Sequence, residues 1–260
     1  MTGAASGLGA SFMRRLAERG YSIVGVSKPG DDVTKVARRI AEHCDVQSFG
    51  VDLDLSQSGC AEVLKQQMDE AGIHISFLVN NLGVGGTSEF IHSRHESNRL
   101  MMNLNIQTTV DMCREFLPDM AEQGSGHVIN VSSMAANFPM PYKSIYSASK
   151  AFVRIFTLGL REEMKPFGVF VNVVQPGAML TNPIVIEQLR YGSFLARFSA
   201  MKPAAVAESA IKGVLINKAI VVPGIKNWLT LGVLRVFPRP LKTAMMVFNY
   251  VRTKKKISLK

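Results

Sequence analysis

The chain has 260 residues, 47% of them hydrophobic, and carries 30 basic against 20 acidic residues, a formal net charge of +10. This length and apolar content fit a single domain with one large core. Three scattered cysteines (Cys44, Cys60 and Cys113) and one close histidine pair (His92 and His95) lack disulfide or metal-ligand spacing, which argues against a disulfide framework and against a metal site.

The chain opens with a glycine-rich turn, TGAASGLG at residues 2–9. Residues 10–19 are predicted to form a helix ended by Gly20, and residues 21–26 a strand. Glycines let the backbone approach a pyrophosphate closely, and the helix N-terminus that follows favours anions. Turn, helix and strand in this order indicate a dinucleotide-binding unit, although glycine-rich turns also occur as plain structural turns.

Strand and helix patterns alternate along the rest of the chain. Near-continuous apolar runs predict strands buried on both faces of a parallel sheet. The expected fold is therefore α/β: a single Rossmann-like, doubly wound parallel sheet with helices on both faces, spanning residues 1–260. The predicted strands are 21–26, 46–52, 75–80, 127–132, 168–174 and 219–222, and the longest predicted helices are 98–122 and 144–165.

Tyr146 and Lys150 are four residues apart, one turn along the same helix face. A free tyrosine has a pKa near ~10, and a nearby ammonium favours its phenolate, so Lys150 is predicted to lower the pKa of Tyr146. Ser133, thirteen residues before Tyr146, could hold the oxygen that gains or loses the proton. A surface helix with an unrelated Tyr and Lys is the alternative for this pair taken alone.

Together these segments resemble the classical short-chain dehydrogenase/reductase family. The resemblance extends to Asn80-Asn81-Leu82-Gly83, to Asn105, to the strand at 128–133 and to the turn at 176–181. It implies hydride transfer at a carbonyl or alcohol. The implied catalytic residues are Ser133, Tyr146, Lys150 and Asn105. The implied cofactor-binding residues are Thr2, Gly3, Ser6, Gly7, Leu8, Gly9, Ser27, Lys28, Asp54, Asn81, Gly83, Tyr146, Lys150, Pro176, Gly177 and Thr181.

The beginning of the chain departs from the family pattern. In this family a hydrophobic strand precedes the glycine turn and occupies the centre of the sheet, whereas here only Met1 precedes Thr2. Without that strand its neighbours would have unpaired backbone groups. We therefore expect that the first strand is truncated and that the natural chain begins several residues earlier.

The end of the second strand bears on the choice of cofactor. An acidic residue there selects NAD, whereas a basic residue without an acid admits the 2′-phosphate of NADP. The segment ends in Ser27 and Lys28 without a carboxylate, and Asp31 and Asp32 are interpreted as turn and helix-start residues. NADPH is therefore favoured over NADH. The resemblance implies an adenine contact from Asp52 or Asp54, and Asp54 is preferred because its distance to Asn80 and the following Leu55-Ser56 fit the family pattern better.

The resemblance implies that Ser133 and Tyr146 bind a substrate carbonyl and that Tyr146 protonates its oxygen. It also implies that Lys150 holds the nicotinamide ribose and that Asn105 supports a water that returns the proton. The C-terminal pattern resembles the ketoacyl, steroid and 3-ketosphinganine reductases. An apolar lid is expected at 182–201, which favours a lipophilic ketone. An NADP-binding regulatory or membrane-surface protein without turnover is the alternative.

The positive charge is concentrated at the C-terminal end. No Asp or Glu follows Glu208, and residues 209–260 carry eleven Lys or Arg, which leaves 19 basic and 20 acidic residues before them. Residues 226–260 combine this charge with apolar residues at helical spacing, a pattern typical of peripheral contact with an anionic membrane surface. Packing over the pocket or in a dimer is the alternative, and the lack of interleaved aromatics argues against nucleic acid. We expect a cytoplasmic homo-oligomer, a dimer or tetramer.

Overall fold

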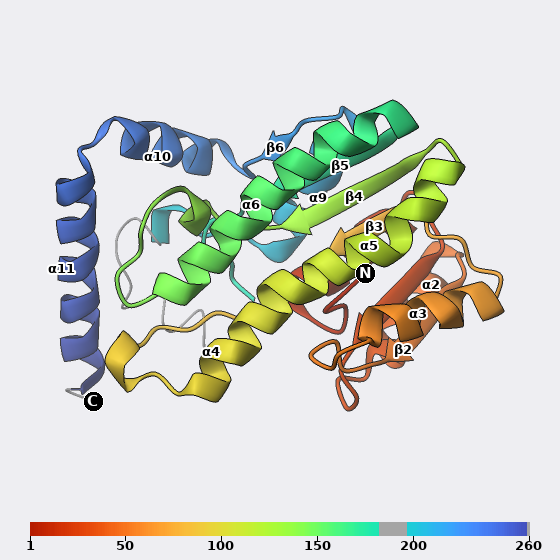
Figure 1. Cartoon of the computed structure of the whole chain (residues 1–260), viewed down its shortest axis with the longest axis horizontal. Coiled ribbons are helices and arrows are strands. Elements are labelled where there is room, and N and C mark those ends of the chain that lie inside the picture. Colours follow the sequence, from red (N-terminus) through yellow and green to blue (C-terminus); the bar gives the residue numbers. More distant parts are fainter. Residues whose placement is uncertain (182–196, 259–260) are drawn as a thin grey trace.

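The structure is a computed structural model that describes residues 1–181 and 197–258, and Figure 1 shows its arrangement. The predicted strands are all present, most of them shortened by one or two residues at an end. In chain order the elements are α1 (Gly7–Ala17), β1 (Ile23–Ser27), α2 (Val33–Cys44), β2 (Ser48–Asp52), α3 (Cys60–Glu70), β3 (Phe77–Asn80), η1 (Phe90–His92), α4 (His95–Met102), η2 (Asn103–Gln107), α5 (Thr108–Glu122), β4 (Gly126–Val131), η3 (Met134–Asn137), α6 (Ser144–Met164), η4 (Lys165–Phe167), β5 (Val169–Val174), α9 (Pro203–Leu215), β6 (Ile220–Val221), α10 (Ile225–Val236) and α11 (Arg239–Ser258).

Within the described residues the strands pair in parallel, as a two-stranded unit β1–β2 and a four-stranded unit β3–β4–β5–β6. Residues 1–4 lie between the two units. The Thr2 amide donates to the Val79 carbonyl of β3 (3.1 Å), and the Val26 amide of β1 donates to the Met1 carbonyl (2.9 Å). The start of the chain thus occupies the central place of the sheet, but it forms only an isolated bridge between Thr2 and Val26.

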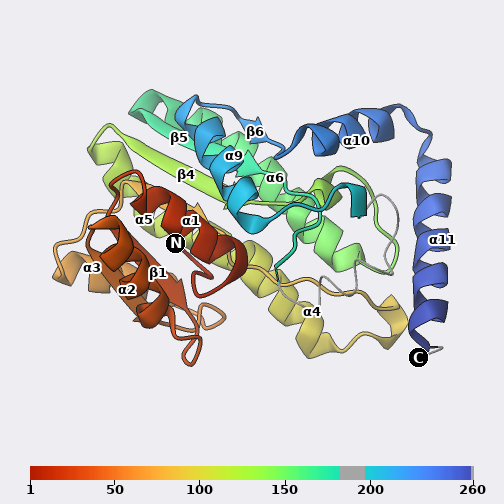
Figure 2. The ribbon, with the colours of Figure 1, turned by 180° about the vertical axis from the view of Figure 1, so that it is seen from behind.

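Helices cover both faces of the sheet, as the opposite views in Figures 1 and 2 show. One face packs against α3, α5 and α6, with Phe116 of α5 and Val128 of β4 in the same core cluster. The other face packs against α1 and α9, where Phe12 and Ile211 surround Ile129. Val128 and Ile129 are neighbours on one strand and point to opposite faces, so the sheet is buried on both sides. The doubly wound α/β fold predicted from the sequence is confirmed.

The predicted helix 98–122 is interrupted. Residues Asn103–Gln107 form a π-helical turn, η2, between α4 and α5. Such turns occur frequently at functional sites, and this one contains the fully buried Asn105.

A row of rings crosses the amino-terminal ends of the strands. Phe77, His127 and Phe170 occupy paired register positions on β3, β4 and β5, with ring centroids 5.4 and 5.5 Å apart. Tyr21 adds an edge-to-face contact to Phe77 at 5.8 Å. Burial lowers the pKa of His127, so the imidazole is neutral at neutral pH.

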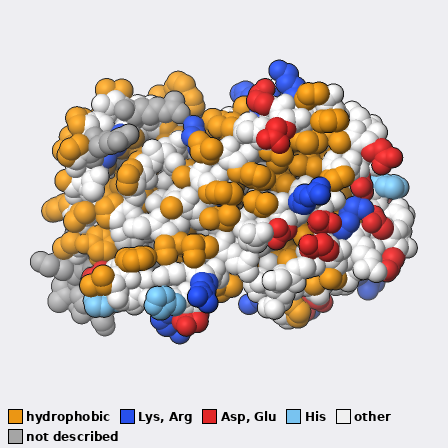
Figure 3. All heavy atoms as spheres, in the orientation of Figure 1, with side chains coloured by type: hydrophobic (Ala, Val, Ile, Leu, Met, Phe, Trp, Pro, Cys, Tyr) orange, Lys and Arg blue, Asp and Glu red, His pale blue; other side chains and the backbone are white. Residues whose placement is uncertain are grey.

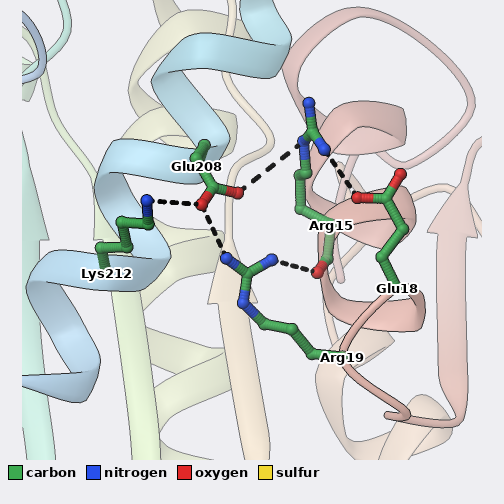
Figure 4. A network of polar contacts seen from close by, with 5 residues as sticks. All are labelled: Arg15, Glu18, Arg19, Glu208 and Lys212. Atoms are coloured by element: carbon green, nitrogen blue, oxygen red, sulfur yellow. Dashed lines mark hydrogen bonds and ion pairs between the residues drawn. The ribbon is translucent and has the colours of Figure 1, made fainter.

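An ion-pair network joins α1 to α9 (Figure 4). Glu208 of α9 accepts from Arg19 at 2.8 Å and lies within 3.2 Å of Lys212 and 3.8 Å of Arg15. Arg19 also donates to the Arg15 carbonyl at 2.7 Å. Because α1 begins in the glycine turn, the network fixes the helix that follows the expected cofactor site.

Candidate active site

Helix α6 carries Tyr146 in its first turn and Lys150 one turn later. Lys150 is 95% buried, and its ammonium donates to the carbonyl of Val131 at 2.9 Å. Val131 is the last residue of β4, directly before Ser132 and Ser133. Burial lowers the pKa of Lys150 to about 8, since a cation loses its hydration in the protein interior.

Ser133 lies between β4 and η3, where its hydroxyl accepts from the Ala135 amide at 3.1 Å. The same side chain is hydrogen-bonded to Tyr146. Burial raises the pKa of Tyr146, and the hydrogen bond to Ser133 opposes this rise only partly. The prediction that Lys150 lowers the pKa of Tyr146 is therefore wrong for this structure, because desolvation dominates and the ammonium bonds the Val131 carbonyl.

Asn105 links the loop after β3 to α6. Its Oδ1 accepts from the Val84 amide at 2.8 Å, and its Nδ2 donates to the Val84 carbonyl and to the Ser149 hydroxyl, both at 3.0 Å. A Cβ on Gly83 would lie 2.9 Å from Asn105 Oδ1 and 3.0 Å from Lys150 Nζ. A side chain there would crowd both groups, so Gly83, Asn105 and Lys150 lie close together.

The glycine turn is tied to the end of β3. The Thr2 hydroxyl accepts from the amides of Asn81 and Leu82 at 3.0 Å, and Asn81 Nδ2 donates to the carbonyls of Thr2 and Gly3 at 3.1 and 3.2 Å. A Cβ on Gly9 would lie 2.0 Å from the Gly3 carbonyl oxygen, so the first turn of α1 crosses the start of the chain at a distance that only glycine allows.

The other predicted residues of this turn differ in what they offer. Gly3 and Gly7 have φ values of +62° and +55°, which favour glycine. The hydroxyl of Ser6, the residue before α1, makes no capping bond within the described part of the chain. The Leu8 side chain is buried in the core beside Phe12, so Leu8 can offer a cofactor only its backbone.

The far end of the expected cofactor site contains Ser27, Lys28 and Asp54. The buried Ser27 hydroxyl accepts from the Ala5 amide at 3.0 Å, which holds the tip of β1 against the glycine turn. Asp54 accepts from the Ser56 amide at 2.9 Å. This bond is the main cause that lowers the pKa of Asp54, with a smaller contribution from the charge of Lys28, so Lys28 acts on the same part of the site.

The turn after β5 lies over the glycine turn. Pro176 accepts from the Met134 amide at 3.0 Å, and a Cβ on Gly177 would meet Asn227 Oδ1 at 2.9 Å. A Cβ on Gly7 would lie 3.5 Å from the Thr181 methyl group. The predicted lid falls mostly on residues 182–196, which lie outside the described residues, so the lid stays a prediction.

A cavity of about 430 Å³ lies directly beside Tyr146. Sequence reasoning missed Tyr142 and Lys143, which line it and belong to no motif, although Lys143 stands one helical turn before Tyr146. The Lys143 ammonium lies 5.9 Å from the centroid of the Tyr146 ring. Further residues that line the cavity are Val84, Gly85, Ser88, Phe90, Arg94, Leu100, Met101 and Ile145.

The short chain dehydrogenase family model matches residues 1–186. Among curated proteins, the very-long-chain 3-oxoacyl-CoA reductase-A of Danio rerio is 33% identical over 192 residues, 72% of this chain and 60% of that protein. The very-long-chain 3-oxoacyl-CoA reductase of Homo sapiens is 33% identical over 180 residues, 68% of this chain and 57% of that protein. The matched region thus spans about 60% of the length of these relatives.

Two solved structures are also similar over nearly the whole chain. One, from a study of 7beta-hydroxysteroid dehydrogenase stereoselectivity, is 25% identical with a TM-score of 0.85 and covers 95% of both chains. The other, a short-chain dehydrogenase from Sphingobium yanoikuyae in complex with NADPH, is 25% identical with a TM-score of 0.76 and covers 92% of this chain and 95% of that one.

Proposed function

The chain belongs to the short-chain dehydrogenase family, and on that basis we propose that it is an NADPH-dependent reductase that converts a lipophilic ketone to a secondary alcohol. The observation that carries the proposal is that Tyr146, hydrogen-bonded to Ser133, lines a cavity of about 430 Å³, with the buried Lys150 one turn later on the same helix. A phenol beside a cavity, a hydroxyl bonded to it and a buried ammonium one helical turn away are a suitable set for transferring a proton to a carbonyl oxygen.

In this proposal Tyr146 is the general acid. Its raised pKa keeps the phenol protonated at neutral pH, so it holds the proton that the substrate oxygen requires. Ser133 orients the carbonyl, Lys150 holds the nicotinamide ribose, and Asn105 positions the loop at Val84 and the helix at Ser149. NADPH, when bound, supplies the hydride.

The fit of the dinucleotide rests on the glycine turn and the strand tips. Gly3, Gly7 and Gly9 carry no side chain that would keep a dinucleotide away from the backbone of the turn. The N-terminus of α1 favours the negative charge of the pyrophosphate. Ser27 and Lys28 are proposed to receive the 2′-phosphate, which selects NADPH over NADH. The structural neighbour from Sphingobium yanoikuyae holds NADPH, which supports this choice.

The substrate is proposed to be a 3-oxoacyl thioester or a ketone of similar apolar character. The curated relatives are named for very-long-chain 3-oxoacyl-CoA reduction, and Phe90, Leu100, Met101 and Ile145 give the cavity apolar walls. A screen of NADPH oxidation against ketones and 3-oxoacyl thioesters of increasing chain length tests this. Binding of NADPH without oxidation across the whole screen would favour a regulatory protein without turnover.

The general-acid role makes a specific prediction for Tyr146→Phe. Turnover of the best substrate should fall by on the order of a hundredfold or more, the scale of general acid–base catalysis, because the ring remains and only the proton donor is lost. Fluorescence titration should show that NADPH still binds with an affinity close to that of the wild type. Turnover equal to the wild type would remove Tyr146 from the mechanism.

We also propose that the chain is cytoplasmic and contacts an anionic membrane surface through residues 226–260. Hydrophobic side chains gather on the half of the face in Figure 3 that carries α10 and α11, while most acidic side chains visible there lie on the other half. Val236 is 85% exposed and Phe248 65%. Within the described residues, none of the helices is long and apolar enough to cross a membrane. Co-sedimentation with anionic vesicles tests the contact.

Self-association as a dimer or tetramer is proposed as well. Phe152 and Ile155 form an exposed apolar stripe on α6, which a second copy could cover. Light scattering coupled to size-exclusion chromatography measures the state directly, and a monomer across the micromolar range would contradict the proposal.

A further inference from the structure

Tyr142 is held in a conformation that few residues adopt. Its φ is +65°, in the left-handed region that is costly for a bulky side chain. Its carbonyl accepts from the Ser88 amide at 2.9 Å, which ties the segment before α6 to the loop after β3. Both segments line the cavity beside Tyr146. The strained residue is thus part of the wall that faces the proposed substrate.

The other side of Tyr142 is covered by the C-terminal helix. The rings of Tyr142 and Tyr250 are stacked with centroids 3.5 Å apart and an angle of 13° between their planes. Figures 1 and 2 show α11 at the margin of the molecule, beyond α10. On α11, Tyr250 faces the body of the protein, whereas Phe248 is 65% exposed.

We propose that Tyr250, stacked on Tyr142, forms an outer layer of the cavity wall and so sets how large a ketone the enzyme accepts. This inference rests on the proposed function. The stacking against Tyr250 helps to offset the cost of the left-handed backbone at Tyr142. Removing Tyr250 therefore frees the Tyr142 ring to turn outward, and the cavity gains room on that side.

The chemistry at Tyr146 does not depend on Tyr250. The hydrogen bonds described above for Ser133, Lys150 and Asn105 join them to η3, β4, the loop after β3 and α6, and none of these bonds involves α11. A change at Tyr250 should therefore alter which substrates fit, with little effect on the turnover of a small ketone. This separates a residue that shapes the cavity from one that catalyses the reaction.

The test compares Tyr250→Ala with two controls. One is a different substitution at position 250, and the other is a substitution elsewhere on α11. Tyr250→Phe keeps the stacked ring without its hydroxyl, and Phe248→Ala removes an exposed ring from α11. The kcat/KM of a bulky ketone relative to a small one should rise about tenfold in Tyr250→Ala, which corresponds to ~1.4 kcal/mol. Both controls should keep the wild-type ratio. A ratio for Tyr250→Ala that matches Phe248→Ala overturns the proposal.

A second measurement does not depend on turnover. Equilibrium dialysis of the largest ketone in the series, with NADP⁺ in place of NADPH so that no hydride can be transferred, should show tighter binding to Tyr250→Ala than to Phe248→Ala by about tenfold. If the wild type reduces no ketone, the proposed function fails. Dialysis then still tests whether Tyr250 forms part of the cavity wall. Equal dissociation constants for the two variants would reject Tyr250 as part of it, whatever the catalytic result.

Discussion

At the scale of single residues, burial has moved the pKa values of two neighbours on α6 in opposite directions. The pKa of Tyr146 is raised, and the pKa of Lys150 is lowered to about 8. Desolvation favours the uncharged form of each group, so it raises the pKa of the tyrosine and lowers the pKa of the lysine. At neutral pH the phenol is protonated and the ammonium is still mostly charged, which suits ketone reduction.

The pKa of Lys150 leads to a prediction for cofactor binding. A base with a pKa of about 8 is charged below that pH and neutral above it. If the ammonium holds the nicotinamide ribose, NADPH affinity should fall roughly tenfold as the pH rises from 7 to 9, the scale of a hydrogen bond to a charged group. Fluorescence titration across this range measures it. Lys150→Met should bind weakly at both pH values, and a wild-type affinity that does not change with pH would contradict the role.

The four residues expected to be catalytic could be named from the sequence, but the surroundings of their side chains could not be predicted from it. Tyr146, Lys150 and Ser133 stand at spacings that reflect a helix and a strand end, which the sequence pattern contains. The pKa of Tyr146 depends on how much of its ring other segments cover, and Tyr142 meets Tyr250 only in the folded chain. Neither the burial of Tyr146 nor the contact between Tyr142 and Tyr250 is indicated by the residues near them in the sequence.

At the scale of elements, the sequence predicted best those helices and strands that have a single, uninterrupted hydrophobic pattern. The near-continuous apolar runs located the strands because burial on both faces of a sheet leaves a continuous hydrophobic signal. The π-helical turn at Asn103–Gln107 was missed, since residues 98–122 keep a helical pattern throughout. That turn places Asn105 where its side chain can bond the Val84 backbone, a contact between segments distant in sequence.

The network between α1 and α9 gives a prediction for stability. Hydrogen bonding to Arg19 is the main cause that holds the pKa of Glu208 below its ordinary value of 4.5. The folded state therefore favours the carboxylate, so this stabilisation is present at neutral pH and is lost as the pH falls through the folded-state pKa. Glu208→Gln should lower the free energy of unfolding at pH 7 by about 1 kcal/mol.

Urea unfolding at pH 7 and at pH 3 measures the effect, and the difference between wild type and variant should shrink at the lower pH. Glu42→Gln is the matched control, because Glu42 pairs with Arg38 where both side chains are largely exposed. It should change stability by only a few tenths of a kcal/mol. Equal effects for the two variants would mean that the network adds nothing beyond a surface pair.

At the scale of the whole molecule, charge and apolar exposure divide the chain. Residues 1–208 are nearly balanced, with 19 basic and 20 acidic residues, whereas residues 209–260 carry eleven basic residues and no acidic one. The same C-terminal part includes the exposed Trp228, Val236 and Phe248. A surface of this kind binds lipid by two additive contributions, apolar insertion and attraction to anionic headgroups.

The two contributions predict how vesicle binding should respond. Wild-type protein should co-sediment with vesicles that contain phosphatidylserine, less so at 0.5 M salt because exposed charges are then screened. The pair of substitutions Val236→Glu and Phe248→Glu should reduce binding at least tenfold. Ile216→Glu, at a site 67% exposed outside α10 and α11, should not. Pelleting of all three proteins alike, regardless of lipid charge, would remove the membrane proposal.

The ring row of Tyr21, Phe77, His127 and Phe170 crosses the amino-terminal end of the sheet, whereas Ser133 follows the other end of β4 and Asn81 the other end of β3. The packing of these rings and the proposed reaction therefore use opposite ends of β3 and β4. For protein engineering, the ring end is a place to screen substitutions for longer enzyme lifetime in a process without re-optimising the reaction at the other end.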